Sequence, residues 1–78
     1  MKLSERLRTG MTIRHYRTGL EYEVLEPYAT HTETGDVLVS YARKDGLDPH
    51  IWSRPLGMFD DIVTYGGETM PRFVEVTP

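Results

Sequence analysis

The chain has 78 residues, no cysteine and a formal net charge of −3 at pH 7. This length predicts one small domain, and the absence of cysteine excludes disulfide bonds and thiolate metal sites. No apolar run of about 18 residues is present and the first residues lack the apolar core of a secretory signal, so we expect a cytoplasmic protein without a membrane partner.

Positive charge is concentrated near the N-terminus. Residues 1–17 hold five basic side chains and one carboxylate, whereas residues 18–78 hold four basic side chains and eleven carboxylates. The basic end favours contact with phosphate, and the remainder of the chain would repel it. Nucleic-acid binding through the basic N-terminal stretch is therefore an alternative function, and it is not the favoured one.

The first segment of the chain is basic and covers residues 1–9. Ser4 as a cap, with Leu3 and Leu7 one turn apart, favours a short helix over residues 3–8. After this segment the hydrophobic period changes to two, which is typical of strands. We therefore expect a β domain over residues 10–78.

The alternation of apolar and polar residues predicts short strands that are separated by turns rich in Gly, Asp and Pro. Pro27 is expected to turn the end of the second strand into an edge or a bulge. The segment Pro55–Phe59 suits a single 3₁₀ turn that places Leu56 and Phe59 on the core. The predicted strands cover residues 13–17, 20–24, 37–41, 50–54, 62–65 and 73–76.

Five or six short strands with almost no helix predict an all-β fold. The connections contain no crossover helix, so the strands are expected to pair in the antiparallel sense. Short strands joined by frequent turns favour a small, strongly bent barrel. Its open edges are compatible with either a monomer or a dimer paired edge to edge.

Four stretches of the sequence, "IRHYRTGLEYEVL", "HTETGDVLVSY", "WSRPLGMF" and "PRF", occur in the order and spacing of a short bacterial family. The chain resembles this family, filed as domain of unknown function 1653, over about residues 10–76. The most specific pieces are R-H-Y and W-x-R-P-L-x-M-F. The resemblance implies an SH3-like β-barrel and brings no established activity.

These two pieces combine aromatic and cationic side chains, the residue types that stack against flat ligands and clamp carboxylates or phosphates. The alternative is that Trp52 is a core residue, Arg54 pairs with a nearby glutamate and His15 is a satisfied strand residue. The candidate ligand-binding residues are Arg14, His15, Tyr16, His31, Glu33, Trp52 and Arg54.

Strand geometry divides this candidate set. Trp52 and Arg54 are two residues apart, so they share one face of their strand. Neighbouring residues point to opposite faces, so only one of His15 and Tyr16 can share a face with Trp52. The other is expected to lie in the core.

Metal binding and catalysis are not expected. The three histidines are scattered, with only His31 and Glu33 close in sequence, and zinc sites need three or four ligands in fixed geometry. The chain has no cysteine nucleophile and no glycine-rich phosphate loop, so we predict no catalytic residue and no cofactor. A small enzyme that uses His15 and Glu33 as an acid–base pair is the second alternative.

The sequence therefore predicts a non-enzymatic binding or adaptor module of the cytoplasm. Its expected partner is a protein, a peptide or a small molecule, because small barrels present aromatic grooves and open strand edges to such ligands. The identity of that ligand is not encoded in any motif of the chain.

Overall fold

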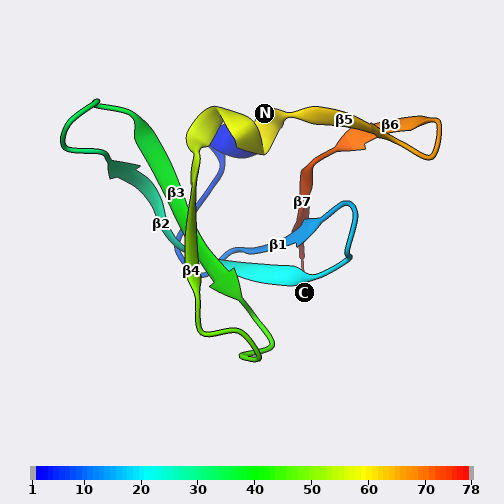
Figure 1. The fold of residues 1–78 in the computed structure, drawn as a ribbon, viewed down its shortest axis with the longest axis horizontal. Helices are drawn as coiled ribbons and strands as arrows, with labels where there is room; N and C mark the ends of the chain where they lie inside the picture. Colours follow the sequence, from blue (N-terminus) through cyan, green and yellow to red (C-terminus); the bar gives the residue numbers. More distant parts are fainter. Residues whose placement is uncertain (1, 78) are drawn as a thin grey trace.

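The computed structural model describes residues 2–77 of the chain (Figure 1). Seven strands form two sheets, with the order β4-β3-β2-β1-β7 in the larger and β5-β6 in the smaller. No helix among the described residues is long and apolar enough to cross a membrane. The elements are η1 (Leu3–Glu5), β1 (Thr12–His15), β2 (Glu21–Thr30), β3 (Val37–Arg43), β4 (Ile51–Pro55), η2 (Leu56–Asp60), β5 (Ile62–Tyr65), β6 (Glu68–Pro71) and β7 (Phe73–Val76).

The topology confirms the all-β, SH3-like prediction. Strands β1 to β4 form an antiparallel meander, and β7 returns to pair with β1 in the antiparallel sense. The 3₁₀ turn η2 follows β4, as the spacing of Leu56 and Phe59 predicts. The sheet is barrel-like and stays open between β4 and β7, because these strands occupy its two edges.

The predicted strand over residues 62–65 is β5, and the strand that the prediction omits is β6, which pairs with β5 in a hairpin. Its turn has positive φ angles at both Gly66 (62°) and Gly67 (84°), a backbone region that favours glycine and suits tight hairpins. Strand β6 carries little hydrophobic alternation of its own, so the sequence pattern alone does not reveal it. Figure 1 shows this hairpin extending from η2 beyond the larger sheet.

Strand β2 bends the larger sheet. It pairs with β1 only through residues 21–23, and its register with β3 shifts twice, between Val24 and Glu26 and between Glu26 and Ala29. Pro27, which has no N–H to donate, lies inside the second shift, so the predicted bulge is confirmed. The bulged strand allows one sheet to curve around a single core.

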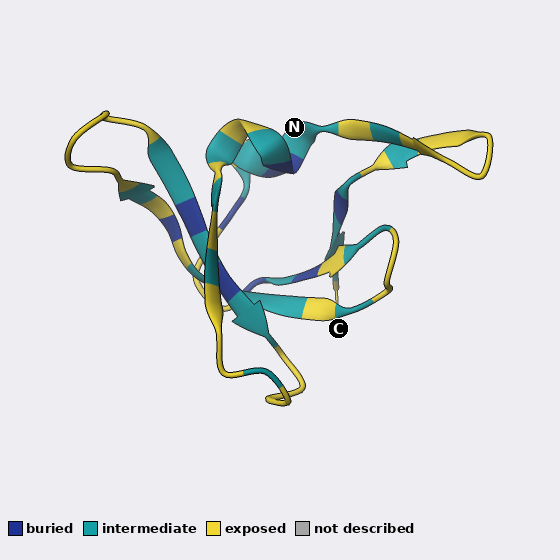
Figure 2. Ribbon diagram, viewed as in Figure 1, coloured by how far each residue is buried: buried dark blue, intermediate teal, exposed yellow. Residues whose placement is uncertain are grey.

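The core combines alternate strand residues with apolar residues from outside the strands (Figure 2). Leu3 and Leu7 of the N-terminal segment are among them, so this segment closes one end of the core. The helix expected over residues 3–8 is a single 3₁₀ turn, Leu3–Glu5. The buried residues are Leu3, Leu7, Met11, Ile13, Val24, Val39, Tyr41, Phe59 and Phe73.

Polar contacts fasten the N-terminal segment to the rest of the fold. The Ser4 amide donates to Asp60 Oδ1 at 3.0 Å, and the Ser4 hydroxyl donates to the other carboxylate oxygen. Arg6 and Arg8 both form ion pairs with Glu75 of β7. Two of the basic side chains near the N-terminus therefore share one carboxylate within the molecule.

Candidate ligand-binding face

Strand β4 presents Trp52 and Arg54 on its inner face. Both are half-buried, whereas Ile51, Ser53 and Pro55 between and around them are exposed. This alternation follows from the period of two in a strand. The two residues of the motif therefore lie together, on the side of the sheet that covers the core.

Arg54 is held in place by aromatic side chains. Its Nε donates a hydrogen bond of 2.6 Å to the hydroxyl of Tyr41, and its guanidinium carbon lies 5.8 Å from the ring centre of Phe73. Among residues 2–77, no carboxylate lies within ion-pair distance of Arg54. The alternative that Arg54 pairs with a glutamate is not what the structure shows.

Trp52 is packed between tyrosines without being enclosed. Its ring stacks beside Tyr41 at 6.3 Å with an interplanar angle of 29°, and the Tyr22 ring meets it at 6.0 Å with an angle of 87°. Such offset and edge-on arrangements are the favoured geometries of aromatic pairs. The indole is partly exposed, so Trp52 is a fixed aromatic at the margin of the core.

His15 faces the same interior. On β1 it shares a face with the buried Ile13, while Arg14 between them is exposed. Its ring lies edge-on to Phe73 at 5.3 Å. His15 and Trp52 therefore both face the core, and Arg14 points away from the core.

The environment of His15 favours the neutral imidazole. Burial, followed by the positive charges of Arg54, Arg72 and Arg17, lowers the pKa of His15 below its ordinary value of 6.5. The backbone N–H of Arg17 also donates to Nδ1 of the ring at 3.2 Å, so the neutral ring carries its proton on Nε2.

Tyr16 does not lie in the core, contrary to the expectation for the neighbour of an inward-facing His15. It follows the end of β1 in the turn and is half-buried. Its ring contacts His15 at 4.7 Å and meets Tyr65 of β5 edge-on at 5.8 Å. The chain leaves the strand at Tyr16, so strict alternation no longer applies.

His31 and Glu33 lie in the loop between β2 and β3, which Figure 1 shows at the opposite end of the molecule from the β1–β2 turn. The His31 Nδ1 accepts hydrogen bonds from the backbone N–H groups of Glu33 (3.2 Å) and Thr34 (3.4 Å). These contacts order the loop. The structure does not bring Glu33 to His15, so the pair needed for acid–base chemistry is not assembled.

Within the described part of the chain, no group of three or more His, Asp or Glu side chains is placed to hold a metal ion. His50, the remaining histidine, contacts Asp48 in the loop before β4. Arg14 stands opposite Glu21 in the register of β1 and β2, and these two side chains form no ion pair.

The structure thus assembles a group of six side chains from β1, β2, β3, β4 and β7, which we name the inner cluster. The motifs identified three of its members. The other three are aromatic residues of predicted strands, and their sequence context does not show what they contact. The inner cluster consists of His15, Tyr22, Tyr41, Trp52, Arg54 and Phe73.

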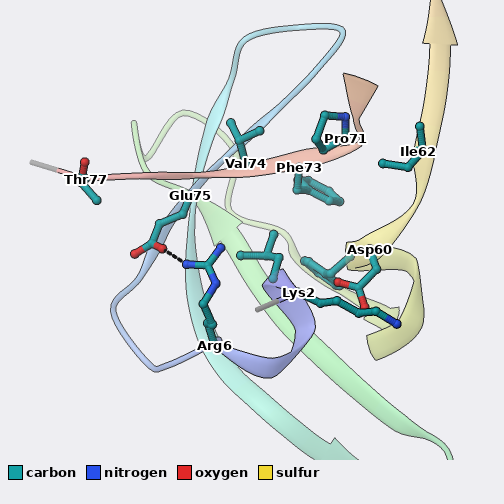
Figure 3. Close-up of a pocket in the computed structure, with 11 residues that line it drawn as sticks. Lys2, Arg6, Asp60, Ile62, Pro71, Phe73, Val74, Glu75 and Thr77 are labelled. Atoms are coloured by element: carbon teal, nitrogen blue, oxygen red, sulfur yellow. Dashed lines mark hydrogen bonds and ion pairs between the residues drawn. The ribbon is translucent and has the colours of Figure 1, made fainter. Parts of the chain in front are cut away.

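A separate cavity of about 590 Å³ lies beyond Phe73 (Figure 3). The Arg6–Glu75 ion pair borders it, and Lys2 and Asp60 stand on its rim. The sequence pattern does not reveal this cavity, because its walls come from three distant segments, the N-terminal segment, the η2–β5 region and residues 71–77. Its apolar lining consists of Leu3, Phe59, Ile62, Pro71, Phe73 and Val74.

Comparison with known proteins places the chain in a family without assigning an activity. No curated protein and no solved structure matches it. A family model described as "Protein of unknown function (DUF1653)" matches residues 11–75, which include β1 to β6, all of β7 except Val76, and the whole inner cluster. The chain therefore belongs to the DUF1653 family.

Proposed function

We propose that this protein is a non-enzymatic binding module and that the inner cluster is its ligand-contact surface. The observation that carries the proposal is the state of Trp52, a large aromatic that is fixed by Tyr41 and Tyr22 and yet partly exposed. Exposed aromatics that are already ordered lose little conformational entropy when a ligand covers them. Binding surfaces are enriched in such residues.

The polar neighbours of Trp52 support a binding surface rather than a catalytic one. Arg54 lies two residues away on the same face, and His15 reaches the same interior from β1. The inner cluster contains no carboxylate and no serine, threonine, cysteine or lysine, and the one side-chain hydrogen bond that the structure describes within it joins Arg54 to Tyr41. It therefore has groups that orient a ligand, and its imidazole is not hydrogen-bonded to a nucleophile within the cluster. The surface therefore suits recognition.

The proposal is tested by screening mixtures of small molecules and short peptides against the whole chain. Trp52 is the only tryptophan, so its fluorescence reports on this surface alone, and amide chemical shifts map each ligand. We expect hits to shift the amides of His15, Trp52 and Arg54. Hits that perturb only residues around the cavity or in the loops would overturn the proposal.

Two variants on one strand provide a matched comparison. Trp52→Phe reduces the aromatic surface of the inner face and is expected to weaken binding of any hit. Ile51→Ala shortens a neighbouring side chain that is 65% exposed on the outer face, and it is expected to leave binding unchanged. Equal weakening by both variants would mean that the ligand is recognised elsewhere.

A further inference from the structure

Positive charge exceeds negative charge around the inner cluster. Arg54, Arg72 and Arg17 all lie close enough to His15 to oppose its protonation. Arg72 has a partner, because its Nε lies 3.4 Å from Asp61 Oδ2. In the part of the chain that the structure describes, neither Arg54 nor Arg17 forms an ion pair. Although the net charge of the domain is −3, the surroundings of the inner cluster are locally positive and favour an anion.

Arg54 is prepared for a two-point contact. Its Nε is occupied by the Tyr41 hydroxyl, and among residues 2–77 its two terminal nitrogens donate to no protein acceptor. The planar fork of a guanidinium matches the two oxygens of a carboxylate or a phosphate. Since Tyr41 and Phe73 already fix the side chain, little rotamer freedom remains to be lost on binding.

Trp52 stands at a defined distance from this charge. Two residues along a strand are about 7 Å apart and point to the same face. An anionic group on Arg54 therefore places the body of its molecule beside the partly exposed indole. A planar aromatic ligand benefits most from this contact, because aromatic rings prefer offset-stacked or edge-to-face arrangements.

We propose that the ligand of the inner cluster is a flat anion, in which an aromatic ring lies against Trp52 and an attached carboxylate or phosphate is held by Arg54. This inference rests on the proposed function, since it names the chemical class that the same surface takes. The two sources of the charge, an aromatic acid and a nucleoside monophosphate, share this chemistry and are separated by the experiment below.

The position of His15 gives the proposal a second readout. The groups that face its ring are Arg54 from β4, Arg72 between β6 and β7, Phe73 at the start of β7, and the turn residues Tyr16 and Arg17. An anion beside Arg54 offsets part of the positive field, so protonation of His15 becomes easier in the complex. By linkage, binding then tightens as the pH is lowered through the pKa of His15 in the bound state.

The test titrates the whole chain with two matched pairs of probes, benzoate against benzamide and adenosine monophosphate against adenosine. Each pair has the same ring and differs in its charge. We expect the charged member to bind at least about tenfold more tightly, because hydrogen bonds to a charged group are the stronger ones. The pair with the larger ratio of affinities, charged member over uncharged member, identifies carboxylate or phosphate as the preferred group. Trp52 fluorescence and amide shifts report binding.

Three variants locate the charge contact. Arg54→Gln is expected to remove the preference for the charged probe, and Arg54→Lys to keep only part of it, because lysine retains the charge without the planar fork. Arg14→Gln removes an equal charge from the outward face of β1 and is expected to change nothing. Circular dichroism of each variant confirms folding, and the lysine variant carries the test if the glutamine variant unfolds.

Every outcome separates the inference from the function on which it rests. Equal binding of benzoate and benzamide at the inner cluster overturns the flat-anion inference and leaves the surface as a binding site. A loss with Arg14→Gln as large as with Arg54→Gln also overturns it. If none of the four probes binds but molecules of other chemistry bind at Trp52, the flat-anion inference is likewise overturned and the surface remains a binding site. Failure of the probes together with hits mapping only elsewhere overturns both proposals.

The dependence of affinity on pH is measured with benzoate, because its charge is constant in the range of interest, whereas a phosphate monoester titrates near pH 6. We expect its affinity to rise as the pH falls from about 7.5 to about 5.5. His15→Gln is expected to remove this dependence while leaving the preference for benzoate over benzamide. A pH dependence that survives in His15→Gln would contradict the assignment of His15 as the responsive group.

Discussion

The Nε of Arg54 donates a hydrogen bond of 2.6 Å to the hydroxyl of Tyr41 on the neighbouring strand β3. Tyr41 is buried, and its ring also contacts Trp52 and Phe73, so one tyrosine connects the guanidinium, the partly exposed indole and the core. Because the core fixes Tyr41, it also fixes the direction in which Arg54 presents its remaining donors.

Tyr41→Phe removes this acceptor and preserves the ring. We expect a loss of about 1 kcal/mol in the free energy of unfolding, the usual net value of one hydrogen bond, measured by chemical denaturation. Affinity for benzoate should also fall, since Arg54 becomes less ordered. Tyr65→Phe is the matched control, because Tyr65 is 52% exposed. An unchanged stability in Tyr41→Phe would show that the hydrogen bond is not formed in solution.

The pKa of His15, followed by NMR, is expected to lie below 6.5 in the free protein, mainly because of burial and then because of Arg54, Arg72 and Arg17. The unfolded chain then binds the proton more readily than the folded one. The contribution of His15 to stability is therefore present above the unfolded pKa and is lost as the pH falls through the folded pKa. Arg54→Gln should raise the His15 pKa, and Arg14→Gln should raise it less. A His15 pKa above 6.5 would contradict this assignment.

Asp60, at the other end of the core, makes the stability of the fold depend on pH in the acid range. Burial alone would raise its pKa, but hydrogen bonds from the Ser4 hydroxyl and amide, together with the charge of Lys2, hold that pKa below the ordinary value. A lowered carboxyl pKa stabilises the fold above the unfolded pKa of about 3.9, and this stabilisation is lost as the pH falls through the folded pKa.

Ser4→Ala is therefore expected to raise the pKa of Asp60 and to make unfolding less dependent on pH below about 4. Denaturation curves at a series of pH values measure this change. Ser53→Ala removes another hydroxyl, one whose partner is Ser40 rather than a carboxylate, and should leave the pH profile as it is. A wild-type pH profile in Ser4→Ala would refute the link between Ser4 and Asp60.

The charge pairing of Glu75 bears on the alternative of nucleic-acid binding. Arg6 and Arg8 both contact this carboxylate, and their hydrogen bonds, followed by their charges, lower its pKa. Since both arginines are paired with this carboxylate and the chain has a net charge of −3, we expect the protein not to retard single-stranded or double-stranded oligonucleotides at low salt. Glu75→Gln frees both arginines and should increase any residual retardation. Wild-type retardation that weakens steeply with salt would favour the nucleic-acid function instead.

The hairpin alternation and the motif spacing predict much of the fold and part of the site. The period of two predicts that Trp52 and Arg54 share a face and that only one of His15 and Tyr16 can join them, because strand geometry is local. The structure shows that this face is the inner one and that His15 is the residue that joins it. The bulge at Pro27 and the 3₁₀ turn after Pro55 are likewise properties of a few adjacent residues. Such features follow from short stretches of sequence, and the structure agrees with them.

The remaining features depend on contacts between distant segments. His31 and Glu33 have a spacing that suits ligands, yet the loop uses the imidazole for its own backbone. The role of Phe73 beside Arg54 and His15 follows only once β7 is known to pair with β1. The cavity is also invisible in the pattern, because the N-terminal segment and β7 meet there only in the folded chain.

The central claim is that the inner cluster, and not the cavity, is where a ligand binds. Intermolecular nuclear Overhauser effects between the ring protons of bound benzoate and the protein test it most directly. We predict such effects to the Trp52 indole and to the His15 ring. Effects to Leu3, Ile62 and Val74, which line only the cavity, with none to Trp52 or His15, would contradict the account.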